Sequence, residues 1–168
     1  MSKFKVNEKI RLGYRYDITD ENDNPVYYVE GSLFHLAPRL TVFTPEGVPV
    51  AHVNRKLITL MPEFDIDIDG QEVAEVKAQL ALFKRKLHVD GPDWQIEGDY
   101  IGHDYHIRDR EGNDIARAER KILALTDKYL LEVFDDENDL LALCTAIAMD
   151  RDKDENDEAA VDAIMRSN

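Results

Sequence analysis

Lysine and arginine residues stand in three short clusters along the chain, and these clusters are the feature of the sequence that could bind an anionic group. Near strand ends, such side chains can hold a phosphorylated headgroup through charge-assisted hydrogen bonds. The alternative, which we favour, is that they lie on solvated strand faces and pair with the many carboxylates, each pair contributing at most about 1 kcal/mol. The candidates for an anion or lipid headgroup are Arg55, Lys56, Lys84, Arg85, Lys86, Arg120 and Lys121.

Two other patterns resemble metal sites, but one lacks required residues and the other lacks the required spacing. The segment DRDKDENDEAAV, which begins at Asp150, opens like a calcium-binding loop. Glu155 then stands where such a loop needs glycine, and Val161 where it needs a bidentate glutamate. His103 and His106 are three residues apart, a spacing that in a strand sends side chains to opposite faces. We therefore expect no metal site.

Catalytic groups are not expected either. Cys144 lies in an apolar stretch, where burial raises the pKa of a thiol instead of activating it. His35, His52 and His88 are isolated and are interpreted as ordinary packed or hydrogen-bonded histidines. The sequence contains no G-x-S-x-G elbow, phosphate-binding glycine loop or H-E-x-x-H pair. It therefore predicts no catalytic residues, no cofactor and no enzymatic activity.

The composition indicates one acidic globular domain. The 168 residues carry a net charge of −14, with 43% hydrophobic and 33% charged residues, which is enough apolar material for a single core. A surface of this charge repels nucleic acid, so we expect no nucleic-acid partner. The single cysteine and the charged N-terminal stretch without a signal sequence predict a cytoplasmic protein.

A repeated unit, consisting of an alternating segment, a polar turn and a second segment rich in valine and alanine, predicts at least four β-hairpins. Apolar Phe64 and Ile66 alternate with Asp65 and Asp67, as in a strand that is buried on one face only. The predicted turns lie at residues 22–25, 45–48, 69–71 and 111–113.

Further short segments raise the expected number of strands to about twelve. They are KLITLM, LFKRKLHV, WQIEGDY, KILALT and KYLLEVF. So many short strands would leave hydrogen-bonding edges exposed in an open sheet. We therefore expect an antiparallel sheet that closes into a barrel or folds into a sandwich.

The alternating pattern stops after Phe134. The acidic run DDEND at residues 135–139 supplies an N-cap and a negative first turn for a helix. A helix of about four turns is predicted to follow. Its body, residues 140–149, is apolar except for Thr145 and so has no polar face. This segment is about half the length of a membrane-spanning helix, so no transmembrane segment is predicted. Only protein can then surround it, and we expect it to lie inside the barrel.

An acidic segment follows the apolar helix. We place the barrel and its central helix at residues 1–150 and an acidic C-terminal tail at residues 151–168. Within the tail, DEAAVDAIMR has helical spacing, so a short helix could dock on a partner or on the barrel. A frayed, solubilising terminus is the alternative and is slightly favoured.

Most of the chain resembles the LURP-one-related family, including its bacterial YxjI-like members. The resemblance lies in YDITDENDNPVYYVEGSLF, LTVFTPEGVPVAHVNRKLITLMPEFDI, WQIEGDYIGHDYHIRDREGNDIARAERK and DDENDLLALCTAIAMDRDKDE. It implies twelve antiparallel strands around a C-terminal helix, the tubby C-terminal fold that this family shares with phospholipid scramblases. It implies less about function, since tubby domains bind phosphoinositide headgroups, plant members are linked to defence and a shared fold does not transfer function.

These observations predict a mainly β, closed antiparallel barrel that acts as a non-enzymatic binding or scaffold domain. Its partner would be an unknown protein or small ligand, contacted by loops at the strand ends. Weak peripheral binding of anionic phospholipid or phosphoinositide headgroups is one alternative. An enzyme acting on a small molecule at the barrel mouth is another, although a barrel filled by its own helix leaves little room for a concave site.

Overall fold

The computed structural model describes residues 1–11, 13–31, 39–59, 61–81, 84–120 and 127–166. For residues 10–11, 13–14, 78–81, 84–86, 127–128, 154–164 and 166, it describes the backbone only. These described parts of the chain form twelve strands, a short 3-10 helix and one long α-helix. No helix within them is both long and apolar enough to cross a membrane.

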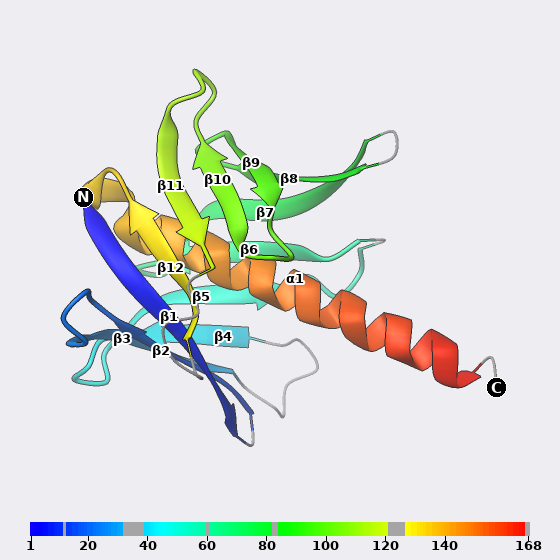
Figure 1. Cartoon of the computed structure of the whole chain (residues 1–168), viewed down its shortest axis with the longest axis horizontal. Helices are drawn as coiled ribbons and strands as arrows, with labels where there is room; N and C mark the ends of the chain where they lie inside the picture. The colour runs from blue at the N-terminus through cyan, green and yellow to red at the C-terminus, as the bar shows by residue number, and fades with distance from the viewer. Residues whose placement is uncertain (12, 32–38, 60, 82–83, 121–126, 167–168) are drawn as a thin grey trace.

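The twelve strands of the described chain form a closed antiparallel barrel, which confirms the expected fold class (Figure 1). Each strand pairs with its neighbours in sequence, and β1 pairs with β12 to close the ring. The strands are β1 (Ser2–Arg11), β2 (Gly13–Thr19), β3 (Pro25–Gly31), β4 (Arg39–Phe43), β5 (Pro49–Arg55), β6 (Glu63–Ile68), β7 (Gln71–Ala81), β8 (Lys84–Asp90), β9 (Trp94–Asp99), β10 (Asp104–Arg108), β11 (Asp114–Glu119) and β12 (Asp127–Val133).

The four hairpins predicted from turn chemistry are confirmed as β2–β3, β4–β5, β6–β7 and β10–β11. The turn between β6 and β7 shows why its residues are suited to it. Asp69 and Gly70 both have positive φ angles, 51° and 77°. Tight hairpin turns require this conformation, and aspartate followed by glycine adopts it with little strain.

One segment that was predicted to be a strand is not one. Of this segment, KLITLM, residues 56–59 and 61 are described and lie in the connection between β5 and β6, where Leu57 is 54% and Ile58 99% exposed. The apolar run suggested a strand, but β5 and β6 already pair with each other, and the N–H of Lys56 donates to the carbonyl of Glu63 at 2.9 Å. A further strand has no free neighbour in the closed ring. All of KILALT, residues 121–126, lies outside the described residues.

The long helix α1 (Asp139–Arg166) enters the barrel directly after β12 and the short helix η1 (Asp136–Asn138). The Asp135 carboxylate caps this start, because it accepts a hydrogen bond from the N–H of Glu137 at 3.2 Å. The helix passes through the barrel and leaves it on the opposite side (Figure 1). It is 28 residues long and continues without a break past residue 150, where the sequence analysis placed the start of a tail.

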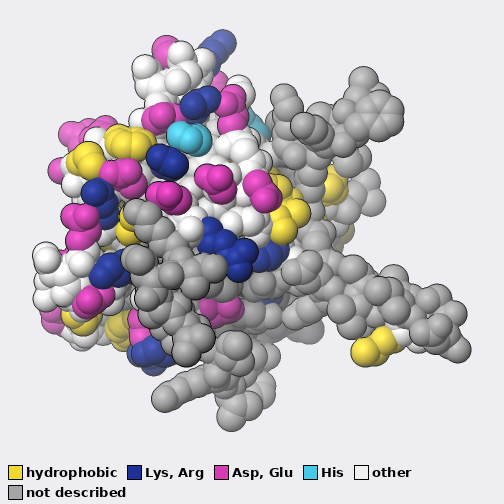
Figure 2. All heavy atoms as spheres, in the orientation of Figure 1, with side chains coloured by type: hydrophobic (Ala, Val, Ile, Leu, Met, Phe, Trp, Pro, Cys, Tyr) yellow, Lys and Arg dark blue, Asp and Glu magenta, His cyan; other side chains and the backbone are white. Residues whose placement is uncertain are grey.

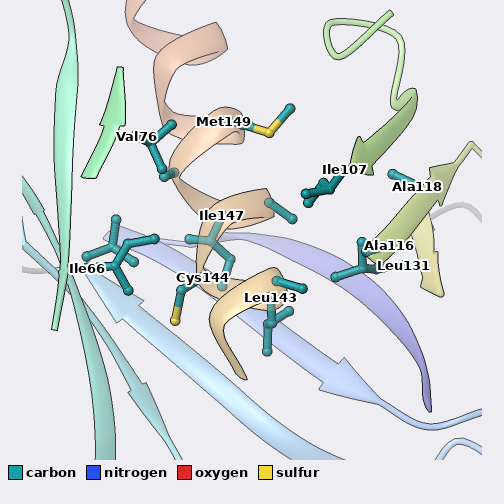
Figure 3. Close-up of a cluster of buried hydrophobic side chains, with 14 of the residues drawn as sticks. Ile66, Val76, Ile107, Ala116, Ala118, Leu131, Leu143, Cys144, Ile147 and Met149 are labelled. Carbon is teal, nitrogen blue, oxygen red and sulfur yellow. The ribbon is translucent and has the colours of Figure 1, made fainter. Parts of the chain in front are cut away.

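The apolar part of α1 fills the barrel, as the sequence predicts. Residues 142–149 are at most 2% exposed. Leu143, Cys144, Ile147 and Met149 lie among inward side chains from opposite walls of the barrel (Figure 3). Several of these wall residues are alanines, which let a helix approach the sheet closely. Burying a leucine or isoleucine here contributes about 1.5–3 kcal/mol. The alanine positions are Ala51, Ala74, Ala116 and Ala118.

The two ends of the barrel differ. We call the end with the β2–β3, β4–β5, β6–β7, β8–β9 and β10–β11 turns, where α1 begins, the turn end. The opposite end, where α1 leaves, is called the exit end and carries the β5–β6 and β9–β10 connections. Because neighbouring strands are antiparallel, every second connection lies at the same end.

Candidate functional site

The basic residues singled out from the sequence lie toward the exit end of the barrel. Arg55 ends β5, Lys84 begins β8, and Arg120 directly follows β11. The sequence clusters are therefore brought to one end by the antiparallel order of the strands. The side chains of residues 84–86 and all of residue 121 lie outside the part of the chain that the structure describes. Anion binding by these residues stays a prediction.

Lys56 is bonded to carboxylates of its own sheet. Its Nζ lies 3.1 Å from Oδ1 of Asp65 and also pairs with Glu75. Hydrogen bonds to Glu75 and Asp65 raise the pKa of Lys56. Burial alone would raise the pKa of Glu75, but hydrogen bonds from Lys56 and Lys77 outweigh it and lower the pKa. Lys56 thus has the carboxylate partners that the favoured interpretation expects.

A pocket of about 360 Å³ lies where the β2–β3 hairpin meets the β4–β5 turn, near the turn end. We call it the outer pocket, because the side chains of Arg15, Asp17 and Tyr28 line it from the outer face of the sheet. Sequence analysis did not single out these residues. The lining residues are Arg15, Asp17, Ile18, Thr19, Pro25, Tyr27, Tyr28 and Pro45.

The pairing of β2 with β3 determines which of the adjacent residues Tyr27 and Tyr28 lies on the outer face of the sheet. Tyr28 pairs with outward-facing Asp17, whereas Tyr27 pairs with Ile18, which is fully buried. The register shifts between Ile18 and Thr19, so an irregularity interrupts the ladder beside the pocket. Such bulges bend a strand and change the direction of its side chains. Tyr28 therefore lies on the outer face of the sheet, and Tyr27 lies on the inner face.

Tyr28 is held between two neighbours. Its ring stacks on Phe43, with centroids 5.0 Å apart and an interplanar angle of 14°. The guanidinium carbon of Arg15 lies 5.4 Å from the centroid of the same ring. Arg15 is fixed in turn by Asp17, at 3.2 Å, and by Glu30, at 3.1 Å. A ring restrained in this way loses little conformational entropy when a ligand packs against it.

The polar wall of the outer pocket is paired within the protein. Burial raises the pKa of Asp17, but hydrogen bonds from Lys9 and Arg15 outweigh this effect and lower the pKa. Burial raises the pKa of Tyr27, and the carboxylate of Asp139 adds to the rise. At neutral pH, Asp17 is therefore ionised and Tyr27 is neutral. The pocket therefore offers a ligand an apolar surface, while its lining Arg15 and Asp17 are paired with each other.

A second group of polar side chains is enclosed inside the barrel near the exit end. Nδ1 of His103 lies 3.3 Å from Oδ1 of Asp150, and the two residues are only 5% and 3% exposed. The imidazole stacks on Tyr129, with centroids 4.6 Å apart and an interplanar angle of 15°. Tyr105 is fully enclosed beside the same carboxylate. We call His103, Tyr105, Tyr129 and Asp150 the interior polar cluster.

The interior polar cluster joins α1 to the wall of the barrel. His103 lies in the β9–β10 connection with a φ of 57°, a left-handed conformation that non-glycine residues adopt when the surrounding structure holds them. Burial raises the pKa of Tyr105 and Tyr129 well above the usual value, and the Asp150 carboxylate raises both further. Both phenols are therefore neutral at physiological pH, and the cluster is suited to hold the helix.

Sequence analysis missed this cluster because it gave Asp150, the last residue of the barrel unit, no partner and began a frayed or docking tail at residue 151. The structure buries Arg151 and Asp152 as well, at 5% and 1% exposure. A signal was present, since Leu143, Ile147 and Asp150 follow one another at helical spacing. The position of Asp150 on the buried face of the helix could have been inferred from this spacing, but its partners could not.

The remaining candidate groups from the sequence are the thiol of Cys144, the imidazole of His106 and possible metal ligands. Burial raises the pKa of the Cys144 thiol to about 12, so it stays protonated. His106 points outward from β10 and lies 3.1 Å from Oδ1 of Asp114, on the other side of the sheet from His103. Within the described residues, no group of three or more histidine, cysteine or acidic side chains is placed to hold a metal ion.

Comparison with known proteins identifies relatives of the whole barrel. A family model described as LURP-one-related matches residues 2–150. The uncharacterized protein YxjI of Bacillus subtilis (strain 168) is 31% identical over 134 residues, which cover 80% of this chain and 81% of that protein. An X-ray structure of a protein from Arabidopsis thaliana superposes with a TM-score of 0.62 at 16% identity, covering 89% of this chain and 91% of that chain. At this identity the superposition shows a shared fold.

Proposed function

The chain belongs to the LURP-one-related family, and from its geometry we propose that it is a non-enzymatic binding domain that holds its ligand on the outside of the barrel. One observation carries this proposal: residues 142–149 of α1 occupy the interior and are at most 2% exposed. Barrels that carry ligands inside need that space to be empty. A filled barrel instead provides a rigid support for contacts on its outer surface.

The outer pocket supports the proposal, since it is partly apolar and its walls are restrained. Its volume of about 360 Å³ lies near the lower end of the range for ligand sites. The Tyr28 wall is braced by Phe43 and Arg15, so it does not need to be ordered when a ligand binds.

The chemistry of the outer pocket argues against catalysis there. Asp17 is the one carboxylate among its lining residues, and its lowered pKa makes it a weak base. General acid–base catalysis works best with a group whose pKa lies near the working pH. The histidine of the interior polar cluster, His103, is enclosed inside the barrel and is not a lining residue of the pocket.

A fragment library that includes small molecules and dipeptides, screened by NMR on the intact chain, tests the proposal. We expect hits that shift the amide signals of β2 and β3 and leave the methyl signals of Leu143 and Ile147 unchanged. Hits that cluster on these interior methyl groups, or chemical conversion of a fragment, would contradict it.

Binding of anionic lipid headgroups is a second candidate, favoured by the placement of the basic clusters at one end of the barrel. Co-sedimentation with phosphatidylcholine vesicles, with and without a phosphoinositide, tests it. Exposed Arg120 lies at the exit end, so Arg120→Glu is expected to reduce salt-sensitive pelleting. Arg110→Glu is the matched control, because Arg110 is 81% exposed in a turn at the opposite end. Absence of salt-sensitive pelleting would exclude this candidate.

A further inference from the structure

We propose that the outer pocket accepts a proline-containing, positively charged peptide segment. The inference rests on the proposed binding function and names its ligand class. Its first support is the apolar part of the pocket, to which Pro25, Tyr27, Tyr28 and Pro45 contribute. Proline rings pack well on tyrosine rings, and a polyproline II segment loses little entropy on binding because it is already extended.

The fold disfavours the other common ways of holding a peptide. The twelve described strands are each paired on both sides, so a peptide cannot add to a free sheet edge. A pocket of about 360 Å³ has room for one or two side chains and is too small for the row of side chains along a helix. A polyproline II segment, whose side chains enter a short aromatic-lined groove, fits both limits.

The charge around the outer pocket favours a cation over an anion. Arg15 is the one cation among the lining residues, and it is bonded to the carboxylates of Asp17 and Glu30. A phosphorylated peptide would need arginines that are free to bind it. Glu46, in the turn that contributes Pro45, is exposed, and a hydrogen bond involving the Thr44 side chain lowers its pKa, so it is ionised at neutral pH. A lysine or arginine of the peptide can pair with such a carboxylate.

The molecular surface adds a longer-range attraction. The chain has a net charge of −14, and acidic side chains are spread over the face shown in Figure 2, with basic ones between them. Such a surface attracts cationic partners and repels anionic ones, and the effect weakens as salt is added. Peptide binding at the outer pocket should therefore be salt-sensitive.

The test uses the intact chain and three fluorescently labelled peptides, followed by fluorescence anisotropy. The first peptide alternates lysine with proline–proline pairs, the second replaces lysine with glutamate, and the third replaces proline with alanine. We expect the first to bind and the other two to bind at least about tenfold more weakly, because each lacks one of the two recognised features.

Variants of the chain then locate the site. Tyr28→Ala and Pro45→Ala are expected to weaken binding of the first peptide about tenfold or more. Tyr28→Phe keeps the ring and should retain binding. Phe134→Ala is the matched control, since Phe134 is an exposed aromatic residue at the turn end that does not line the pocket. Pro45 lies in an exposed turn, so its variant reports on binding even if Tyr28→Ala unfolds the chain.

Each outcome decides a separate claim. Binding that survives both Tyr28→Ala and Pro45→Ala would overturn the outer pocket as the peptide site but leave a binding domain. Failure of the intact chain to bind the first peptide, or equal binding of all three, would overturn the ligand class. If fragments still bind to the outer surface of the same protein in the NMR screen, the proposed binding function is retained and only the peptide ligand class is rejected.

Discussion

The outer pocket and the interior polar cluster are made of similar side chains and differ in what surrounds them. Both contain tyrosines and an aspartate paired with a basic side chain, Asp17 with Arg15 in one and Asp150 with His103 in the other. The Arg15 side chain is 42% exposed, whereas those of His103 and Asp150 are 6% and 3% exposed. The first group is open to a ligand, and the second is closed by the barrel.

Burial, more than residue type, separates this binding surface from this structural anchor. The charges of an exposed ion pair remain solvated, so the pair contributes about 1 kcal/mol or less to the free energy of unfolding. A buried pair has lost its water, so removing one partner leaves the other charge or polar group without compensation. Substitutions in the cluster should therefore affect stability, and substitutions in the pocket should affect binding.

The largest effect is expected for Asp150→Ala, which removes the carboxylate from the interior polar cluster. It leaves His103 buried opposite an apolar side chain, and breaking a buried pair in this way costs about 3–5 kcal/mol. Urea unfolding measures the free energy of unfolding. Asp104→Ala is the control, since Asp104 is exposed in β10 near the same connection. A loss below about 1 kcal/mol for Asp150→Ala would show that the cluster does not anchor the helix.

Leu143→Ala separates the apolar contribution of α1 from that of the cluster. Leu143 is fully buried inside the barrel, so truncation creates a cavity and is expected to cost about 2–5 kcal/mol. Thermal unfolding followed by circular dichroism gives the difference. If the variant is as stable as the wild type, the helix does not fill the space that the account requires.

The pH dependence of stability tests the polar wall of the outer pocket. The pKa of Asp17 is lowered in the folded chain from an unperturbed value of 3.8. Its ionised form therefore stabilises the fold above about pH 4, and this contribution is lost as the pH falls through the lowered pKa. Asp17→Asn should remove that part of the acid sensitivity, worth about 1 kcal/mol or less. The free energy of unfolding of the wild type and of Asp17→Asn is measured between neutral and acidic pH. A difference between the two proteins that does not change with pH would contradict this prediction.

The smallest effect is expected for Tyr105→Phe. The Tyr105 hydroxyl is buried and has no hydrogen-bond partner among the described residues. Removing it should leave the free energy of unfolding within about 0.5 kcal/mol of the wild type or raise it, because an unsatisfied polar group is lost. Denaturant unfolding provides the value, and a loss above about 1 kcal/mol would indicate that the hydroxyl contributes a hydrogen bond to the cluster.

Much of the fold could be predicted because it follows from local patterns. The alternation of Phe64 and Ile66 with aspartates fixed the faces of β6, and the turn residues located the hairpins. The apolar run at residues 140–149 was enough to place a helix inside a barrel. The segment KLITLM was misassigned because apolar composition alone does not show whether a neighbouring strand is available for pairing.

The sites could not be predicted to the same extent, because they depend on contacts between distant segments. Asp150 was placed at the last position of the barrel unit without any partner, yet His103 pairs with it and stacks on Tyr129. Tyr27 and Tyr28 are adjacent in sequence, and only the pairing of β3 with β2 and β4 shows which of them stacks on Phe43. Such partners become visible only after the barrel has closed.

Hydrogen exchange of the backbone amides at residues 142–149 tests most directly whether the helix fills the barrel permanently. If the helix does so, these amides should exchange only through global unfolding, with a free energy equal to that from urea unfolding of the same protein. Exchange at a much lower free energy, with the strand amides still protected, would mean that α1 leaves an intact barrel and opens an interior for ligands. That result would contradict the assignment of binding to the outer surface.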